Sequence, residues 1–266
     1  MSAPIAVSIA GSDSSGGAGI EADLKTFAAL GVYGAAVTTA LTAQNTNGIF
    51  AIHEVPPGFI AAQVDAVFTD LDVGAVKIGM LANAAAIDVV AAALDRYRPR
   101  HTVLDPVMVA SSGERLLRGD ALVQLRALIA RVALVTPNLP ETAALLDTAP
   151  ARDEKEMQAQ AQKLLALGAP AVLIKGGHAG GAESVDLLVE ADGGLLRLVA
   201  PRHATKNTHG TGCTFASAIA AGLAKGLPLR EAAQQAKTYV SAAIAAADRL
   251  AVGTGRGPLH HFHAWW

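Results

Sequence analysis

Short apolar runs alternate with glycine turns and helical segments along this chain, and that alternation most constrains its fold. The first unit is an apolar run at residues 5–10, a turn at 11–19 and a helix to about residue 30. Further strands are expected at residues 35–43, 75–78, 102–104, 132–135 and 171–175. Strands that alternate with helices pair in parallel through right-handed crossovers. The sequence therefore predicts an α/β fold with a mostly parallel central sheet and helices on both faces.

One segment departs from this alternation. Within residues 184–201, the turn Ala191-Asp192-Gly193-Gly194 separates two strand-like runs, which predicts a small antiparallel hairpin. The intervening helices are expected near residues 59–70, 84–97, 120–130, 140–147, 153–167, 213–225 and 229–251. Because the chain has no linker, internal repeat or low-complexity block, we expect a single domain over residues 1–266.

Composition narrows the class of partner and the compartment. The chain is 52% hydrophobic but only 4% aromatic, which suits a core of Ala, Val, Leu and Ile between regular layers. A net charge of -2 gives no electrostatic reason to expect nucleic acid or an anionic membrane. The single cysteine, Cys213, excludes an internal disulfide and a Cys-rich metal site. With no signal peptide and no apolar stretch of about 20 residues, a cytoplasmic protein is expected.

Polar and glycine-rich residues gather where the predicted strands end, which is where open parallel sheets bind ligands. The glycine-rich turn at residues 11–19 is one such place, and its end satisfies a loose dinucleotide pattern, G-x-G-x-x-G/A, at residues 17–22. That pattern also needs an acidic residue about 20 positions later to hold a ribose hydroxyl. Residues 37–45 offer none, so a nicotinamide-dependent oxidoreductase is disfavoured.

The turn at residues 207–213 precedes a long Ala-rich helix and carries the sharpest chemical signal. Its glycines allow successive N–H groups to converge, and the helix start adds free N–H groups and a positive dipole end. Such a site stabilises the negative charge of a phosphoryl group in transfer. The same dipole is expected to favour the thiolate of Cys213. The alternative is a small apolar residue packed at a helix start.

The residues Gly210-Thr211-Gly212-Cys213 resemble the anion-hole turn of the ribokinase-like superfamily, which more often has Asp in the last position. The Cys form is found in the hydroxymethylpyrimidine/phosphomethylpyrimidine kinases of thiamin biosynthesis and in some related bacterial pyridoxal kinases. The resemblance covers nearly the whole chain, including residues 10–25, 42–46, 77–81, 105–108, 136–141 and 260–266. It implies a ribokinase-like three-layer sandwich.

The resemblance also implies a reaction. That reaction is ATP-dependent, Mg²⁺-assisted phosphorylation of 4-amino-5-hydroxymethyl-2-methylpyrimidine to its monophosphate and then to the diphosphate, by a homodimer. A pyridoxal or pyridoxine kinase of the same superfamily is the nearest alternative. A non-catalytic nucleotide- or pyrimidine-binding protein is a second, although the residues of the transfer site all remain.

Five residues are assigned to the pyrimidine. The Gln44 amide donates and accepts at once, so it can pair with an amino group and the neighbouring ring nitrogen. Asp23, Gly11, Met80 and Val107 correspond to substrate-pocket positions of the resembled family. The alternatives are a solvated surface for Gln44 and Asp23 and ordinary core packing for Met80 and Val107.

A second group is assigned to the nucleotide and to catalysis. Cys213 is expected to take the hydroxymethyl proton, while the N–H groups of residues 210–213 bind the transferred phosphoryl group. The resemblance assigns Lys175, Asp105, Asn138 and Thr211 to the nucleotide and phosphates, and Glu141 to Mg²⁺ through water. The alternative interpretations are that Lys175 is an ordinary solvated lysine and that Glu141 only stabilises a helix dipole.

The aromatic and histidine-rich end of the chain suggests a further site at first sight. His260, His261 and His263 lack the i, i+4 spacing and the nearby carboxylate of a metal cluster. The aromatic residues Phe262, Trp265 and Trp266 predict instead a tail docked by apolar burial.

Overall fold

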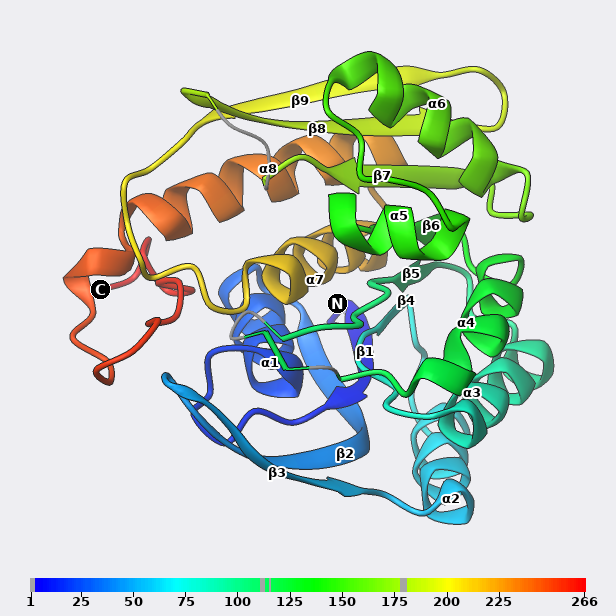
Figure 1. Ribbon diagram of the computed structural model, residues 1–266. Helices are drawn as coiled ribbons and strands as arrows, with labels where there is room; N and C mark the ends of the chain where they lie inside the picture. Colours follow the sequence, from blue (N-terminus) through cyan, green and yellow to red (C-terminus); the bar gives the residue numbers. More distant parts are fainter. Residues whose placement is uncertain (1–2, 111–112, 115, 178–180) are drawn as a thin grey trace.

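The computed structural model describes residues 3–110, 113–114, 116–177 and 181–266. Its strands form one nine-stranded sheet in the order β3-β2-β1-β4-β5-β6-β7-β8-β9 (Figure 1). The parallel part consists of β1 (Ile5–Gly11), β2 (Tyr33–Asn45), β4 (Ala75–Ile78), β5 (Thr102–Leu104), β6 (Leu134–Val135) and β7 (Ala171–Lys175). The mostly parallel sheet predicted from the alternation is confirmed.

Helices cover both faces of this sheet and complete three layers. One face packs against α2 (Pro57–Phe68), α3 (Ala84–Tyr97), α4 (Leu122–Ile129), α5 (Leu139–Leu146) and α6 (Glu154–Leu165). The other face packs against α1 (Gly19–Ala29), α7 (Thr211–Ala224) and α8 (Leu229–Ala245). Small buried residues let α7 lie close to the strands, and ten of its residues are buried. This close packing fixes the start of α7 at the carboxyl ends of the central strands.

Both edges of the sheet are antiparallel, and only one of them was predicted. The hairpin β8 (Glu183–Glu190) and β9 (Leu195–Pro201) matches the prediction for residues 184–201. At the other edge β3 (Gly48–Glu54) pairs with β2 through the turn Thr46-Asn47, which the sequence analysis missed. β2 also runs to Asn45 rather than residue 43, so Gln44 lies on a strand and not in the loop beyond it.

The carboxyl-terminal tail is docked, as predicted, and it contacts α7 and α8 through residues other than the predicted ones. His260 and His261 are buried, and the His261 ring lies 3.0 Å from the Thr214 hydroxyl. Tyr239 in α8 donates a hydrogen bond to the His261 carbonyl. Trp265 and Trp266 are 70% and 66% exposed, so the prediction that they anchor the tail is wrong. No helix in the described part of the chain has the length and apolar character to cross a membrane.

Candidate active site

The start of α7 is pressed against the glycine-rich turn that follows β1. Gly210 caps the helix with φ 81°, in the left-handed region that favours glycine. A Cβ atom there would lie 1.9 Å from the Gly17 carbonyl oxygen, so no other residue fits without moving the backbone. The segment before the carboxyl-terminal tail also contacts this turn, because the His209 N–H donates to the Gly257 carbonyl. The N–H groups of Gly212 and Cys213 belong to the first helical turn and have no intrahelical partner.

A lysine with little exposure to solvent lies beside this helix start. Lys175 Nζ, at the end of β7, is 2.5 Å from Asp105 and 3.9 Å from Glu141. A Cβ on Gly212 would meet Lys175 Nζ at 3.2 Å and Asp105 at 3.5 Å. The structure therefore brings together Gly212, Lys175, Asp105 and Glu141 from four separate parts of the sequence. The solvated alternative for Lys175 is wrong, since its side chain is only 12% exposed.

Asn138 and Glu141 begin α5 as a capping box, in which each side chain binds the other residue's backbone N–H at 2.8 Å. Burial raises the pKa of Glu141 to about 7; Lys175 opposes the shift, and Asp105 adds to it. Because burial disfavours the ionised form of Glu141, a second cation beside Lys175 would stabilise that form. The pair Asp105 and Glu141 suits Mg²⁺, which typically uses one or two carboxylates together with phosphates. Among the described residues, however, no group of three or more His, Cys, Asp or Glu residues could hold a metal alone.

Cys213 faces the starts of two helices. The Gly19 N–H, at the beginning of α1, binds its sulfur, and α7 contributes its own positive end. Burial nevertheless raises the pKa of the thiol to about 11; Lys77 opposes the shift, while Asp23 and Asp105 reinforce it. The prediction that the helix dipole would favour a thiolate is therefore wrong for this chain. Loss of water around the sulfur is the largest cause of this shift, and a thiol with a pKa of about 11 is neutral at pH 7.

Asp23 lies beneath the site rather than in its wall. Its carboxylate is fully buried and pairs with Lys77 Nζ at 2.7 Å. It also accepts hydrogen bonds from Ser8 at 2.5 Å and Ser217 at 2.7 Å. Both the predicted contact with substrate and the alternative of a solvated helix surface are therefore wrong. Ser217 is four residues after Cys213 in α7, so this buried ion pair supports the helix turn that carries the thiol.

Gly11, Met80 and Val107 gather at the end of β1. A Cβ on Gly11 would lie 3.0 Å from the Met80 sulfur, and Val107 packs with Met80 in a small apolar cluster. The predicted apolar wall is thus assembled as a unit. Thr211 Oγ1 donates to the Thr208 carbonyl at 2.8 Å, so its hydroxyl also shapes the turn. Lys237, for which the sequence analysis makes no prediction, pairs with Asp186 at 2.7 Å.

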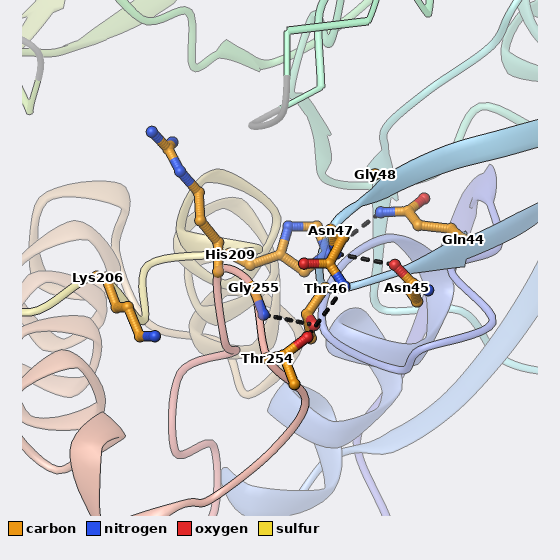
Figure 2. Close-up of a pocket in the computed structure, with 10 residues that line it drawn as sticks. Gln44, Asn45, Thr46, Asn47, Gly48, Lys206, His209, Thr254 and Gly255 are labelled. Carbon is orange, nitrogen blue, oxygen red and sulfur yellow. Dashed lines mark hydrogen bonds between the residues drawn. The ribbon is translucent and has the colours of Figure 1, made fainter.

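The sequence analysis overlooked His209, which contacts Gln44, and Asp13, which contacts His209. His209 Nε2 lies 3.2 Å from the Gln44 amide (Figure 2). The same nitrogen lies 2.7 Å from the carboxylate of Asp13, which is buried in the turn after β1. Gln44 and His209 both line a cavity of about 410 Å³ between the β2–β3 turn, Lys206 and residues 254–256. His209 and Asp13 both lie within segments that the sequence analysis considered, residues 207–213 and 10–25. Nothing in the sequence alone pairs the first loop with the turn 196 residues later.

A helix start built as an anion site, a largely desolvated lysine beside it and an apolar wall with one amide define a ribokinase-like small-molecule phosphotransferase. The family model for phosphomethylpyrimidine kinase matches residues 13–260. The chain belongs to this family.

Relatives and solved structures agree with this membership. The chain is 58% identical over 263 residues to a hydroxymethylpyrimidine/phosphomethylpyrimidine kinase of Rhizobium meliloti, covering 98% of both chains. It superposes on a Clostridium difficile phosphomethylpyrimidine kinase with TM-score 0.79 and 41% identity, covering 90% of this chain and 99% of that one. It also superposes on an ADP complex of Bacillus subtilis pyridoxal kinase with TM-score 0.90 and 33% identity, covering 99% of both chains.

Proposed function

We propose that this chain phosphorylates 4-amino-5-hydroxymethyl-2-methylpyrimidine with ATP, first to the monophosphate and then to the diphosphate used for thiamin diphosphate. The observation that carries the proposal is the convergence of the Gly210–Cys213 turn, Lys175 and Gln44 at one end of the sheet. The family membership and the 58% identity to the Rhizobium meliloti enzyme support the same substrate.

In this proposal each residue has a defined task in the first transfer. The N–H groups of Gly212 and Cys213 bind equatorial oxygens of the transferred phosphoryl group, and Lys175 neutralises their charge. Asn138 holds the nucleotide phosphates through its amide N–H groups. Thr211 holds them from the other side of this cluster once its hydroxyl turns away from the Thr208 carbonyl. Mg²⁺, held through water by Glu141 and Asp105, would supply further charge neutralisation when bound. Gln44 orients the ring against Gly11, Met80 and Val107.

Cys213 acts here as a neutral hydrogen-bond donor, because its thiol stays protonated at pH 7. The Gly19 N–H already binds the sulfur, and the S–H is left to hold the hydroxymethyl oxygen in line. As the oxygen–phosphorus bond forms and the bond to ADP breaks, the hydroxyl proton passes to an oxygen of the transferred group. A loose transition state needs little help from a base before this stage.

Pyridoxal kinase is the second candidate, and the higher TM-score of the Bacillus subtilis pyridoxal kinase favours it. Backbone similarity reports the shared fold, whereas substrate choice depends on side chains. Sequence identity is higher to the Clostridium difficile phosphomethylpyrimidine kinase, at 41% against 33%. The aminopyrimidine therefore remains the better supported substrate.

Product analysis tests the proposal directly. The purified chain, incubated with the hydroxymethylpyrimidine, ATP and Mg²⁺, is expected to form the monophosphate before the diphosphate by anion-exchange chromatography. Turnover of pyridoxal without turnover of the pyrimidine would contradict it. We further propose that residues 1–266 act as one domain in a cytoplasmic homodimer; light scattering of the purified chain tests its oligomeric state.

A further inference from the structure

Residues 253–257, which we call the strap, have the sequence Gly-Thr-Gly-Arg-Gly, with glycine at every second position. A Cβ on the first of these glycines would come closer than 3.0 Å to the side chain of Thr46, and one on the second would come equally close to the Thr46 carbonyl. A Cβ on the third would come closer than 3.0 Å to the Asn207 amide. The three glycines therefore allow the strap to lie directly against two residues that are far apart in the sequence.

Hydrogen bonds join the strap to the turn Thr46-Asn47 between β2 and β3. The Gly255 N–H donates to the Thr46 hydroxyl oxygen at 3.1 Å, and the Arg256 N–H donates to the Thr46 carbonyl at 2.8 Å. The Asn47 amide donates to the Thr254 hydroxyl at 3.2 Å (Figure 2). One end of the strap is therefore bound to the tip of the β2–β3 turn.

The other end of the strap is bound to the segment that leads into α7. The Gly257 N–H donates to Asn207 Oδ1 at 3.0 Å, and the Gly257 carbonyl accepts from the His209 N–H at 3.1 Å. Asn207 also donates to Asp248 at 2.8 Å. Beyond the strap, the His260 N–H donates to a carbonyl of α8 at 3.1 Å. The strap is thus fixed to the helical layer, next to the turn that begins α7.

The β2–β3 turn lies at the edge of the sheet, where its position depends on such contacts. β3 is the edge strand, and most of its side chains are exposed. Gln44, two residues before Thr46, is supported from the glycine-rich turn after β1. There the Ser14 hydroxyl donates to the Gln44 carbonyl at 2.7 Å and accepts from the Gln44 N–H at 2.8 Å. The strap supplies a second support, which joins the end of β2 to the start of α7.

We propose that the strap sets the distance between the substrate ring and the transfer turn, residues 210–213, so that it suits the hydroxymethyl acceptor of the first transfer. The inference rests on the proposed function, because it concerns the two acceptors of that reaction. In each transfer an acceptor oxygen bonds to the γ-phosphorus of ATP as the bond to ADP breaks. In the second transfer this oxygen belongs to the phosphoryl group already added, so it lies farther from the ring.

The two acceptors therefore need different ring positions at the same transfer turn. A strap of five residues with hydrogen bonds at both ends favours the nearer position, which suits the shorter acceptor. Loosening the strap lets the β2–β3 turn move outward, and the hydroxymethyl oxygen is then misplaced, whereas the longer monophosphate still reaches the turn. A misplacement of about 1 Å can cost about a hundredfold in rate. Thr46 and Asn207 are thus positioning residues, because they act on the acceptor through the strap.

Gly255→Ala tests this directly. Gly255 does not have a left-handed φ, so alanine fits its backbone, but the new Cβ would meet the Thr46 carbonyl and force the strap away from the turn. We would measure kcat/KM separately for the hydroxymethylpyrimidine and for its monophosphate, with saturating ATP and Mg²⁺. The value for the first acceptor should fall about ten- to a hundredfold, and the value for the monophosphate by less than about threefold.

Two further variants separate the strap from general damage. Thr46→Val keeps the shape of the side chain and removes the hydroxyl that accepts from Gly255. It should lower the ratio of the two kcat/KM values by about threefold, the effect of one neutral hydrogen bond, and it carries the test if Gly255→Ala does not fold. Gly58→Ala, in α2 with nothing within 4 Å of the new Cβ, is the matched control and should leave both values unchanged.

Hydrogen exchange of the chain without substrate gives a second readout. Gly255→Ala should speed exchange of the His209 amide, whose acceptor Gly257 belongs to the strap, and Gly58→Ala should not. The inference is overturned if the folded variants slow both transfers in proportion, or if the His209 amide exchanges as in the parent. A parent that phosphorylates neither acceptor would contradict the proposed function and the inference with it, whereas a parent active on both with a proportional loss in the variants contradicts the inference alone.

Discussion

The elevated pKa of Cys213 leads to a quantitative prediction about the reactivity of its thiol. Cys213 is the only cysteine, so any thiol modification of this chain reports on the transfer turn. With a pKa of about 11, roughly one thiol in ten thousand is ionised at pH 7, against about 3% for an ordinary cysteine with pKa ~8.5. Only the thiolate is a nucleophile. Iodoacetamide should therefore modify the folded chain about 300-fold more slowly than an ordinary cysteine, before any effect of restricted access.

The pH dependence of this reaction separates ionisation from access. Restricted access lowers the rate equally at every pH, whereas a raised pKa moves the midpoint of the profile. The alkylation rate, followed by the mass of the intact protein, should rise about tenfold per pH unit from pH 7 to pH 9. The same chain in urea should show an ordinary midpoint near 8.5. A midpoint below 8 in the folded chain would refute the argument that burial outweighs the helix dipole, and would restore Cys213 as a proton acceptor.

Other perturbations test the rest of the site. Cys213→Ala should slow the first transfer by only about tenfold, as for one lost hydrogen bond, and the second transfer less; a loss of 10²–10⁴ in the first step alone would indicate a general base. Gly210→Ala should cost about 2–4 kcal/mol in urea unfolding, because its Cβ would meet the Gly17 carbonyl. The control Gly226→Ala, at φ 85° with nothing within 4 Å, should cost only the ~1–2 kcal/mol of left-handed strain. Lys175→Met should reduce kcat by about 10²–10³ and raise the pKa of Glu141; unchanged kcat would contradict its role. In the folded chain the pKa of Asp13 lies below the ordinary 3.8, so the ionised carboxylate stabilises the fold above pH 3.8, and this stabilisation is lost as pH falls towards 2. Asp13→Asn should reduce the loss of stability over this pH range, measured by thermal unfolding.

The sequence determined the α/β class, the order of most elements and the end of the sheet that carries the site. These follow from local signals, namely apolar runs, glycine turns and helix starts, which lie within a few residues of one another. For the same reason the turn at residues 207–213 is recognisable as an anion site from its residues alone. β3 was missed because its side chains are largely exposed at a sheet edge, so it lacks the alternating pattern of a half-buried strand.

The tertiary structure alone decided the properties that depend on several distant segments. The surroundings of Cys213 depend on distant segments, and burial among them raises the pKa of its thiol. Asp23 and Lys77 are 54 residues apart, and only their shared buried position shows that Asp23 supports α7 instead of contacting substrate. Asp13, Gln44 and His209 meet from three loops or strand ends. Their meeting follows from packing that no local pattern records.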